Sequence, residues 1–352
     1  MKYLLIFLLS IMIFSCNTKE SNNNNTDKAT INLDNSIDND NADKAAINLD
    51  DSTDNNINKT EQSNTDDKDN KSNNSSINTN EPEETTYYSY TDEEIISFIE
   101  SGDFQTIKKL IESKSLDVNY NLGDEYSKST PLIQAIKYKQ TDIINYLLEN
   151  NADVNLTLGY STPLTEAMYD EELVRKLIDL GADVNLPAEL TGFTPLMASL
   201  HNIAITELLI EKGADIEAKD DDGINALVYA ASFNNEEMVK FLLEKGADAN
   251  TVCEIKNEHT DISPTPLMNA AYKGNTNIIN MLLENGADIN YTTDYGMTAL
   301  MYAASFNQFE AAKVLLENNA DTSITDEDGY TALDLAKSEN YEDIVELLEK
   351  YN

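Results

Sequence analysis

Residues 265–290, TPLMNAAYKGNTNIINMLLENGADIN, carry the pattern that decides the fold. Threonine followed by proline is typical of a helix start, because threonine caps the first turn and proline needs no N–H there. Ile278, Ile279, Leu282 and Leu283 then recur at spacings that place them on one face of a second helix. Glycine after that helix suits the left-handed conformation in which many helices end. The stretch predicts a pair of helices followed by a turn.

The same pattern recurs through the C-terminal three-quarters of the chain. A degenerate unit, Glu93–Asn119, comes first, and seven regular units start at Thr130, Thr162, Thr194, Asn225, Thr265, Thr298 and Thr331. Their spacing is close to 33 residues. Three of the seven units carry an alanine pair and four end in a Gly-Ala-Asp motif, so the chain resembles the ankyrin-repeat family. The resemblance implies an all-α solenoid of helix-turn-helix repeats with short β-hairpin fingers. It also implies that the concave face and the fingertips bind other proteins.

Several positions depart from the family pattern. The histidine that often follows Thr-Pro-Leu is absent, so we expect methionine and isoleucine packing in place of its hydrogen bond. Asn151 and Asn319 replace the helix-ending glycine and are expected to have positive φ, which asparagine tolerates. The units from Thr162 and Thr194 lack two residues between their helices, and a seven-residue insertion lies within Thr251–Pro264. Helix packing is expected to continue through these irregularities, with altered loops.

The N-terminus is typical of an exported protein. Residues 1–15 contain Lys2 and then the apolar run Tyr3–Phe14, which is shorter than the ~20 residues that span a bilayer. Ile13-Phe14-Ser15-Cys16 resembles the lipobox of bacterial lipoproteins, although Phe14 is bulkier than the usual residue. The resemblance implies that Cys16 becomes an acylated N-terminus carrying, for example, palmitate. The alternative is an ordinary signal peptide with a chance cysteine.

Between this anchor and the repeats lies a polar stretch. Residues 16–86 contain no aromatic side chain and are dominated by Asn, Asp, Ser, Thr and Lys. They cannot bury enough apolar surface to offset their conformational entropy, so a disordered tether is expected before a repeat domain at residues 87–352. The predicted location is the bacterial cell envelope, lipid-anchored, with the outer membrane or cell surface favoured over the inner membrane.

Charge narrows the range of partners. The net charge is −40, and residues 87–352 contribute −31 of it, with 17 basic and 48 acidic side chains. Nucleic acid is excluded, because its binding depends on Lys and Arg neutralising phosphates. Membrane contact is expected through the lipid alone. A basic protein would be attracted, although acidity could equally serve only solubility. The chain is expected to be monomeric.

Reactive groups do not converge in this sequence. Cys253 and His259 lie in the insertion without a third group to orient them, which argues against a nucleophile and base. The stretch Asp220–Gly223 lacks the alternating ligands of a calcium loop and is interpreted as a finger turn. We therefore expect no enzyme activity, no metal and no cofactor.

Aromatic residues give the best functional signal. They recur just after the small pair, near the end of the first helix of a unit, or one turn earlier on the same face. Rings are the usual anchors of interfaces. The predicted partner-binding residues are Tyr138, Tyr169, His201, Tyr229, Phe233, Tyr272, Tyr302 and Phe306. The alternative for some of them, Tyr229 and Tyr302 first, is packing between neighbouring helices.

Three functions remain open at this stage. The preferred one is recognition of a partner protein by the concave groove. The others are a structural or protective envelope lipoprotein without a specific groove ligand, and a secreted factor that acts on another cell. Exposed aromatic anchors favour the first, whereas acidity alone would suffice for the second.

Lipid attachment can be tested directly. Cys16→Ala removes the only thiol in the lipobox-like stretch, so labelled fatty acid should no longer be incorporated and the protein should leave the membrane fraction. Cys253→Ala is the matched control and should be labelled like the parent. Unchanged labelling of Cys16→Ala would refute the lipid assignment.

Overall fold

The computed structural model describes residues 90–123, 128–253, 255–257, 260–262 and 264–351. The chain divides into two units, residues 1–83 and 84–352, and all described residues belong to the second. The predicted signal peptide, Cys16 and the tether therefore lie outside the described residues, as does His259. No helix in the described ranges has the length and apolarity needed to cross a membrane.

Eight helix pairs follow one another in the described part of the chain. The first begins with Thr91 as N-cap, two residues before the predicted start at Glu93. The pairs are α2 (Asp92–Glu100) and α3 (Phe104–Glu112), α4 (Pro131–Lys137) and α5 (Thr141–Glu149), α6 (Pro163–Glu166) and α7 (Glu171–Asp179), α8 (Pro195–Ala198) and α9 (Ile203–Glu211), α10 (Ala226–Ser232) and α11 (Glu236–Glu244), α12 (Pro266–Lys273) and α13 (Thr276–Glu284), α14 (Ala299–Ser305) and α15 (Phe309–Glu317), and α16 (Ala332–Ser338) and α17 (Glu342–Glu349).

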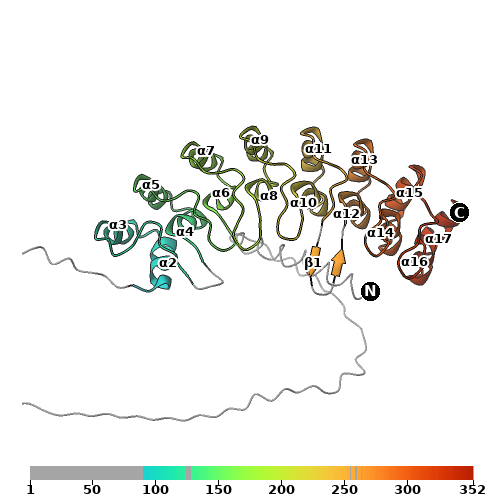
Figure 1. Ribbon diagram of the computed structural model, residues 1–352, viewed down its shortest axis with the longest axis horizontal. Helices are drawn as coiled ribbons and strands as arrows, with labels where there is room; N and C mark the ends of the chain where they lie inside the picture. Colours follow the sequence, from blue (N-terminus) through green and yellow to red (C-terminus); the bar gives the residue numbers. More distant parts are fainter. Residues whose placement is uncertain (1–89, 124–127, 254, 258–259, 263, 352) are drawn as a thin grey trace, which may run out of the picture. The chain divides into compact units, whose positions relative to one another are not determined.

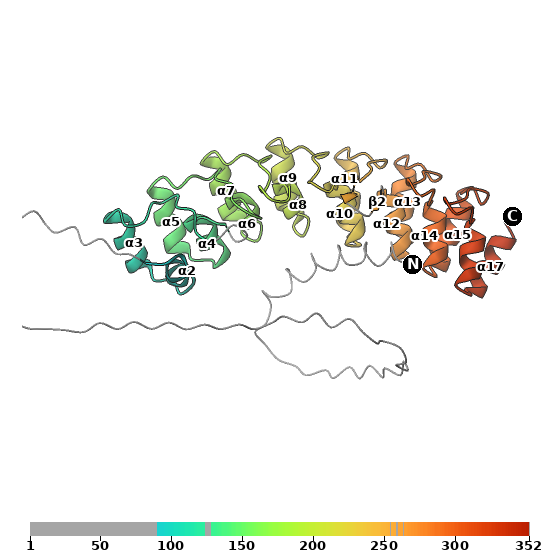
Figure 2. The same cartoon turned by 60° about the horizontal axis from the view of Figure 1, so that its bottom comes forward.

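The helices form two parallel rows within this unit. Even-numbered helices make the inner row of an arc and odd-numbered helices the outer row (Figure 1), and Figure 2 shows the same succession. Every inner helix contacts the next inner helix, from α2 through α16. Each pair also packs its own two helices together. The core is therefore a continuous layer between the rows, as expected for a solenoid.

Local sequence explains why each inner helix starts where it does. The threonine or asparagine at every start is the N-cap, and its side-chain oxygen accepts the N–H three residues on, as Thr265 does from Met268 at 3.3 Å. Ala270 and Ala271 on the next turn are fully buried, because their small side chains allow α10, α12 and α14 to approach closely. The predicted caps and close packing are both present.

The positions that lack the family's histidine are mostly filled by packing. Ile133, Met197, Val228, Met268 and Met301 are all buried there, which confirms the expected apolar replacement. In the units from Thr162 and Thr331 the same position holds a polar residue, Thr165 or Asp334. Their side chains bond back to the N-cap backbone and complete capping boxes.

The two short repeats differ from the others mainly in their inner helices. Helices α6 and α8 have only four residues each, whereas the other inner helices have seven to nine. The missing residues include the left-handed position that Lys139 and Asn234 occupy at φ 57° and 60°. Packing continues along the inner row, as expected, but the outer contacts α5–α7 and α9–α11 are weaker than the rest.

The fingers are mostly turns rather than the predicted β-hairpins. Their backbone closes through single bonds such as Asp326 N–H to Tyr330 O at 2.9 Å, or through an isolated bridge such as that between Leu122 and Ser129. Among the described residues only the insertion forms paired strands, β1 (Ile255–Asn257) and β2 (Thr260–Ile262), which run antiparallel with Ile255 opposite Ile262. The insertion is thus a longer finger with paired strands, at one of the places where an altered loop was expected.

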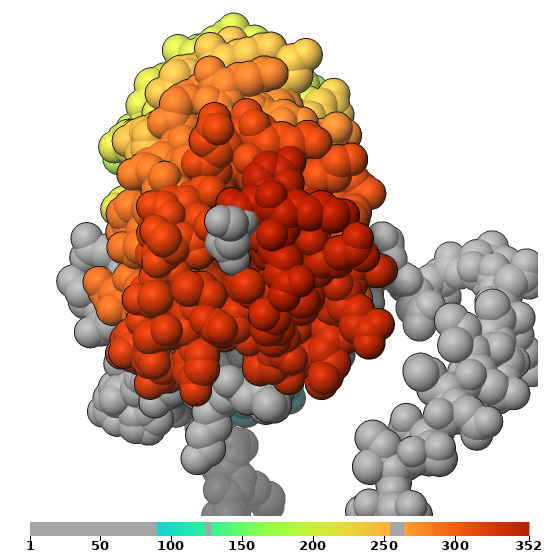
Figure 3. All heavy atoms as spheres, turned by 90° about the vertical axis from the view of Figure 1, so that its right-hand side faces the viewer, coloured from blue at the N-terminus to red at the C-terminus, as the bar shows by residue number. Residues whose placement is uncertain are grey.

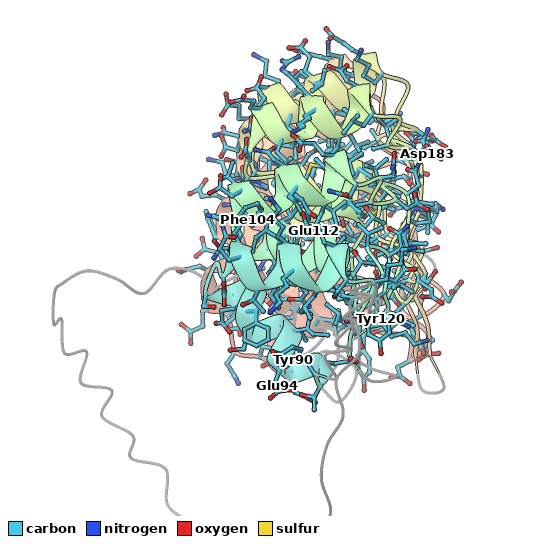
Figure 4. The ribbon with its side chains drawn as sticks, turned by 90° about the vertical axis from the view of Figure 1, so that its left-hand side faces the viewer. Tyr90, Glu94, Phe104, Glu112, Tyr120 and Asp183 are labelled. Carbon is cyan, nitrogen blue, oxygen red and sulfur yellow. The ribbon has the colours of Figure 1, made fainter. Side chains whose placement is uncertain are left out.

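Polar surfaces close both ends of the array. At the C-terminal end (Figure 3), α17 exposes Glu342, Asp343 and Glu346, and Lys350 pairs with Glu346 at 3.0 Å. At the N-terminal end (Figure 4), α2 exposes Glu93 and Glu94. Tyr90 and Tyr120 border a shallow hollow there, together with Asp92 and Ser115. Such terminal units are expected of a repeat array, whose end faces have no further neighbour.

A ladder of hydrogen bonds ties consecutive repeats together beside the fingers. A side-chain oxygen of one residue accepts the N–H of the aspartate that ends the next Gly-Ala-Asp or Asn-Ala-Asp motif, and the six distances are 2.7–2.9 Å. Three asparagines also donate their amide to a neighbouring glycine carbonyl. The acceptors are Asn119, Asn155, Asn185, Glu217, Asn250 and Asn290. This ladder fixes the register between units.

Removing one rung should loosen the array. Asn185 accepts from Asp215 N–H at 2.8 Å and donates to Gly213 O at 3.0 Å, so Asn185→Ala is expected to lower the free energy of unfolding by about 1 kcal/mol. Urea denaturation measures the change. Asn280→Ala on the exposed face of α13 is the control and should cost little. Equal effects of the two substitutions would mean that the ladder contributes no stability.

Candidate functional site

Five of the eight predicted binding residues lie in the turns that join inner to outer helices, and Tyr229, Tyr272 and Tyr302 lie within inner helices. A second set of hydrogen bonds links these turns, because a side chain in one turn donates to a carbonyl of the previous turn. The His201 Nε2–H bonds Met168 O at 3.1 Å, Asn235 Nδ2 bonds Leu200 O at 3.0 Å, and Gln308 Nε2 bonds Tyr272 O at 3.0 Å. The turns therefore form a row with a fixed order.

Tyr169 is the most exposed of the predicted rings. It follows the shortened α6 and is 71% exposed. Its ring stacks on His201, with centroids 4.3 Å apart and an interplanar angle of 25°. Burial lowers the pKa of His201, and its bond to the Met168 carbonyl opposes that shift. Tyr138, at the end of α4, is half-buried against the core.

Tyr229 and Tyr302 belong to the core. They are 8% and 9% exposed, and burial raises the pKa of Tyr302 to about 12. The Tyr229 hydroxyl donates to Asp220 Oδ2 at 2.6 Å, and its ring meets Phe193 edge-on. Neither ring can offer a partner much surface in this structure, so we remove both from the binding surface. The alternative of core packing is the correct one for these two residues.

The remaining three rings divide between surface and packing. Phe233 is 51% exposed and stacks on Tyr229 at 5.8 Å. Tyr272 and Phe306 are half-buried and meet edge-on at 4.5 Å across two repeats. Tyr272 lies within α12, whereas Tyr138, Phe233 and Phe306 are C-caps of their helices. Tyr272 follows its N-cap by seven residues, whereas the three C-cap rings follow theirs by eight, so the predicted register was wrong by one residue at Tyr272.

Exposed apolar residues at the fingers were missed by the sequence reasoning. Tyr160 is 60% exposed, Leu190 42% and Tyr330 52%, and each lies within two residues of a finger glycine. A large apolar side chain next to a turn glycine was the available signal. Because the same turns contain acidic residues such as Asp328, the fingertips join the turns as candidate contact surfaces.

The side chains that were candidates for chemistry are buried or hydrogen-bonded within the fold. Cys253 is buried, and burial raises the pKa of its thiol to about 12, so it is not a thiolate nucleophile. Asp220 accepts from the backbone of Asp222 and Ile224 as well as from Tyr229. Its carboxylate serves the finger turn, in agreement with that interpretation. Among the described residues no group of three or more His, Cys, Asp or Glu is arranged to hold a metal.

The repeat pattern is matched by known proteins. A family model described as ankyrin repeats matches residues 89–158, 164–253, 249–326 and 267–352. Human ankyrin repeat and SOCS box protein 6 is 36% identical over 118 residues, which are 30% of this chain and 28% of that protein. E3 ubiquitin-protein ligase KEG of Arabidopsis thaliana is 28% identical over 47% of this chain and 11% of its own length. Palmitoyltransferase AKR1 of Lachancea kluyveri is 27% identical over 56% of this chain and 27% of its own. The chain thus spans less than a third of each of these relatives.

The role of Tyr229 can be separated from that of Tyr302 by a matched pair of variants. Both occupy the same position in nearly identical helices, ALVYAAS and ALMYAAS. Tyr229→Phe removes the donor to Asp220 and should lower the free energy of unfolding by about 1–2 kcal/mol. Tyr302→Phe should change it by less than about 0.5 kcal/mol. Chemical denaturation of both proteins tests this, and equal losses would contradict the assigned role of the hydrogen bond.

Proposed function

We propose that this chain, which belongs to the ankyrin-repeat family, binds a partner protein through the turns of its inner row and through its fingertips. Membership of the family indicates protein–protein interaction. The observation that carries the proposal is the pair of exposed rings, Tyr169 and Phe233, in turns held in order by hydrogen bonds. Rigid aromatic side chains on a preorganised surface are the features of an interface hot spot.

Two further features of the proposal come from the N-terminal sequence. Ile13-Phe14-Ser15-Cys16 supports a lipid anchor in a bacterial envelope, and residues 17–86 would then join the anchor to the array. Several acyl chains on one cysteine would hold the protein firmly, at ~0.8 kcal/mol for each buried methylene. The recognition function does not depend on this anchor.

Catalysis forms no part of the proposed function. Two relatives are named as enzymes, a ubiquitin ligase and a palmitoyltransferase, but the chain matches only 11% and 27% of their lengths. In the described residues the two groups considered for chemistry, Cys253 and Asp220, are engaged in folding. The alternative is a purely structural envelope role, which would not explain why the aromatic rings of Tyr169 and Phe233 are exposed.

Site-specific photo-crosslinking tests the proposal in intact cells. A photoreactive phenylalanine analogue at position 169 or 233 should capture a defined protein, because these positions lie in the exposed turns. The control position is Lys313, which is exposed on the outer helix α15. Capture of the same protein from position 313 alone would place the interface on the outer row and refute the proposal.

The captured partner then allows a quantitative test. Tyr169→Ala with Phe233→Ala should weaken binding by about 2 kcal/mol or more, roughly 30-fold, because truncated hot-spot rings have effects of this size. The free energy of unfolding should fall by less than about 1 kcal/mol for each lost ring contact. Full binding by the double variant would refute the aromatic surface, as would a collapse of the melting temperature.

A further inference from the structure

Three neighbouring turns in the middle of the array form one exposed aromatic surface. We define the central aromatic surface as Tyr169, His201 and Phe233. Tyr169 stacks on His201, and Phe233 stacks on the buried Tyr229. A stacked ring uses one face against its partner, and with 71% and 51% exposure Tyr169 and Phe233 present the rest to solvent. Both short inner helices, α6 and α8, end in this region.

The surface is held in place before any partner arrives. His201 bonds the carbonyl before Tyr169, and Asn235 bonds the carbonyl before His201. Three consecutive turns are thereby linked side by side. Such a surface loses little conformational freedom on binding, so it suits a ligand that runs along several repeats.

The charge around the rings is entirely negative within these turns. Residues 166–172, 198–204 and 232–237 contain six acidic side chains and no lysine or arginine. Asp170, Glu172, Glu236 and Glu237 are exposed. The nearest cations in sequence already have partners, because Arg175 pairs with Glu171 at 2.7 Å and Lys240 with Glu244 at 3.9 Å.

Neighbouring turns show what occupies a comparable ring elsewhere in the array. The Lys137 ammonium lies 5.7 Å from the centroid of Tyr138, and the Lys273 ammonium lies 5.2 Å from that of Tyr272. These tyrosines are covered by a lysine of the chain itself. Among the described residues, neither Tyr169 nor Phe233 has a lysine or arginine over its ring. The central rings therefore offer a position that an external cation can fill.

We propose that the central aromatic surface binds arginine side chains of an extended, basic segment of the partner protein, an inference that rests on the proposed function. A guanidinium group stacks on aromatic rings and pairs with carboxylates through parallel hydrogen bonds. A guanidinium group can therefore bind both the aromatic rings and the carboxylates of this surface. An extended segment can place successive arginines on successive turns, whereas a compact cation would fill one turn only.

A pair of synthetic peptides tests the chemistry of the ligand. The first is a flexible peptide in which arginine alternates with glycine and serine, and the second replaces every arginine with citrulline, which has nearly the same shape but no charge. Calorimetric titration of the full chain should show binding of the arginine peptide and at least ~10-fold weaker binding of the citrulline peptide. Each desolvated cation–π contact raises the affinity by about a factor of ten or more.

Matched variants test the position of the site. Glu172→Gln with Glu237→Gln removes two exposed carboxylates that follow the rings by three and four residues. Glu284→Gln with Glu317→Gln removes two exposed carboxylates at the far ends of outer helices. The net charge changes equally in both. The first pair should weaken the arginine peptide ~10-fold and the second less than ~2-fold, because only nearby carboxylates can pair with the guanidinium groups.

A third variant separates the rings from apolar surface in general. Tyr169→Leu with Phe233→Leu keeps an apolar side chain but removes the aromatic faces, and should weaken the arginine peptide ~10-fold at an unchanged melting temperature. Equal binding of the arginine and citrulline peptides would overturn the inference. So would equal effects of the two glutamate pairs, which would indicate attraction by net charge alone.

The two proposals can fail separately. Photo-crosslinks from positions 169 and 233 together with no preference for arginine would leave the interaction surface in place and refute only its basic ligand. Loss of those crosslinks would refute the interaction surface itself, whatever the peptides show.

Discussion

No helix pair in this protein can bury its apolar faces alone, and the rest of the structure depends on that constraint. Each inner helix contacts the next along the whole row, and buried alanine pairs such as Ala303 and Ala304 bring neighbouring backbones close. Stability is consequently a property of adjacent repeats rather than of single ones. The groups that remain for function are those outside this shared layer, at the turns, at the fingers and on the outer row.

Polar ladders on two edges of the array complement the apolar layer. Beside the fingers, a side chain from one repeat accepts the aspartate N–H of the next repeat, as Asn250 does from Asp288. At the turns, His201, Asn235 and Gln308 reach back to carbonyls of the previous repeat. Hydrogen bonds are directional, so they set the register that apolar contact leaves loose. The same bonds that order the stack hold the exposed rings at defined positions.

The two short repeats show how a change in the scaffold alters the surface. Without two residues, α6 and α8 end after four residues and lack the left-handed turn of their neighbours. Tyr169, in the turn after α6, is the most exposed aromatic ring in the described residues. The turns that hold Tyr169, His201 and Phe233 contain acidic side chains and no lysine. The exposed ring and the acidic side chains therefore lie in the same turns, in the middle of the array.

The sequence by itself determined the features that depend on neighbours along the chain. Helix starts, the apolar stripe of each second helix and the positive φ of 65° at Asn151 and Asn319 all follow from local chemistry. The repeat spacing then implied the stacking, because such units have no other way to bury their faces. The eight helix pairs were predictable for this reason.

Only the tertiary structure decided which side chains the stack leaves exposed. Tyr229 and Phe233 are one helical turn apart, yet one is buried against Phe193 and Asp220 and the other is half exposed. The difference arises from the preceding repeat and its finger, which the spacing of aromatic residues does not report. Exposure depends on groups distant in sequence, and a local pattern cannot specify it.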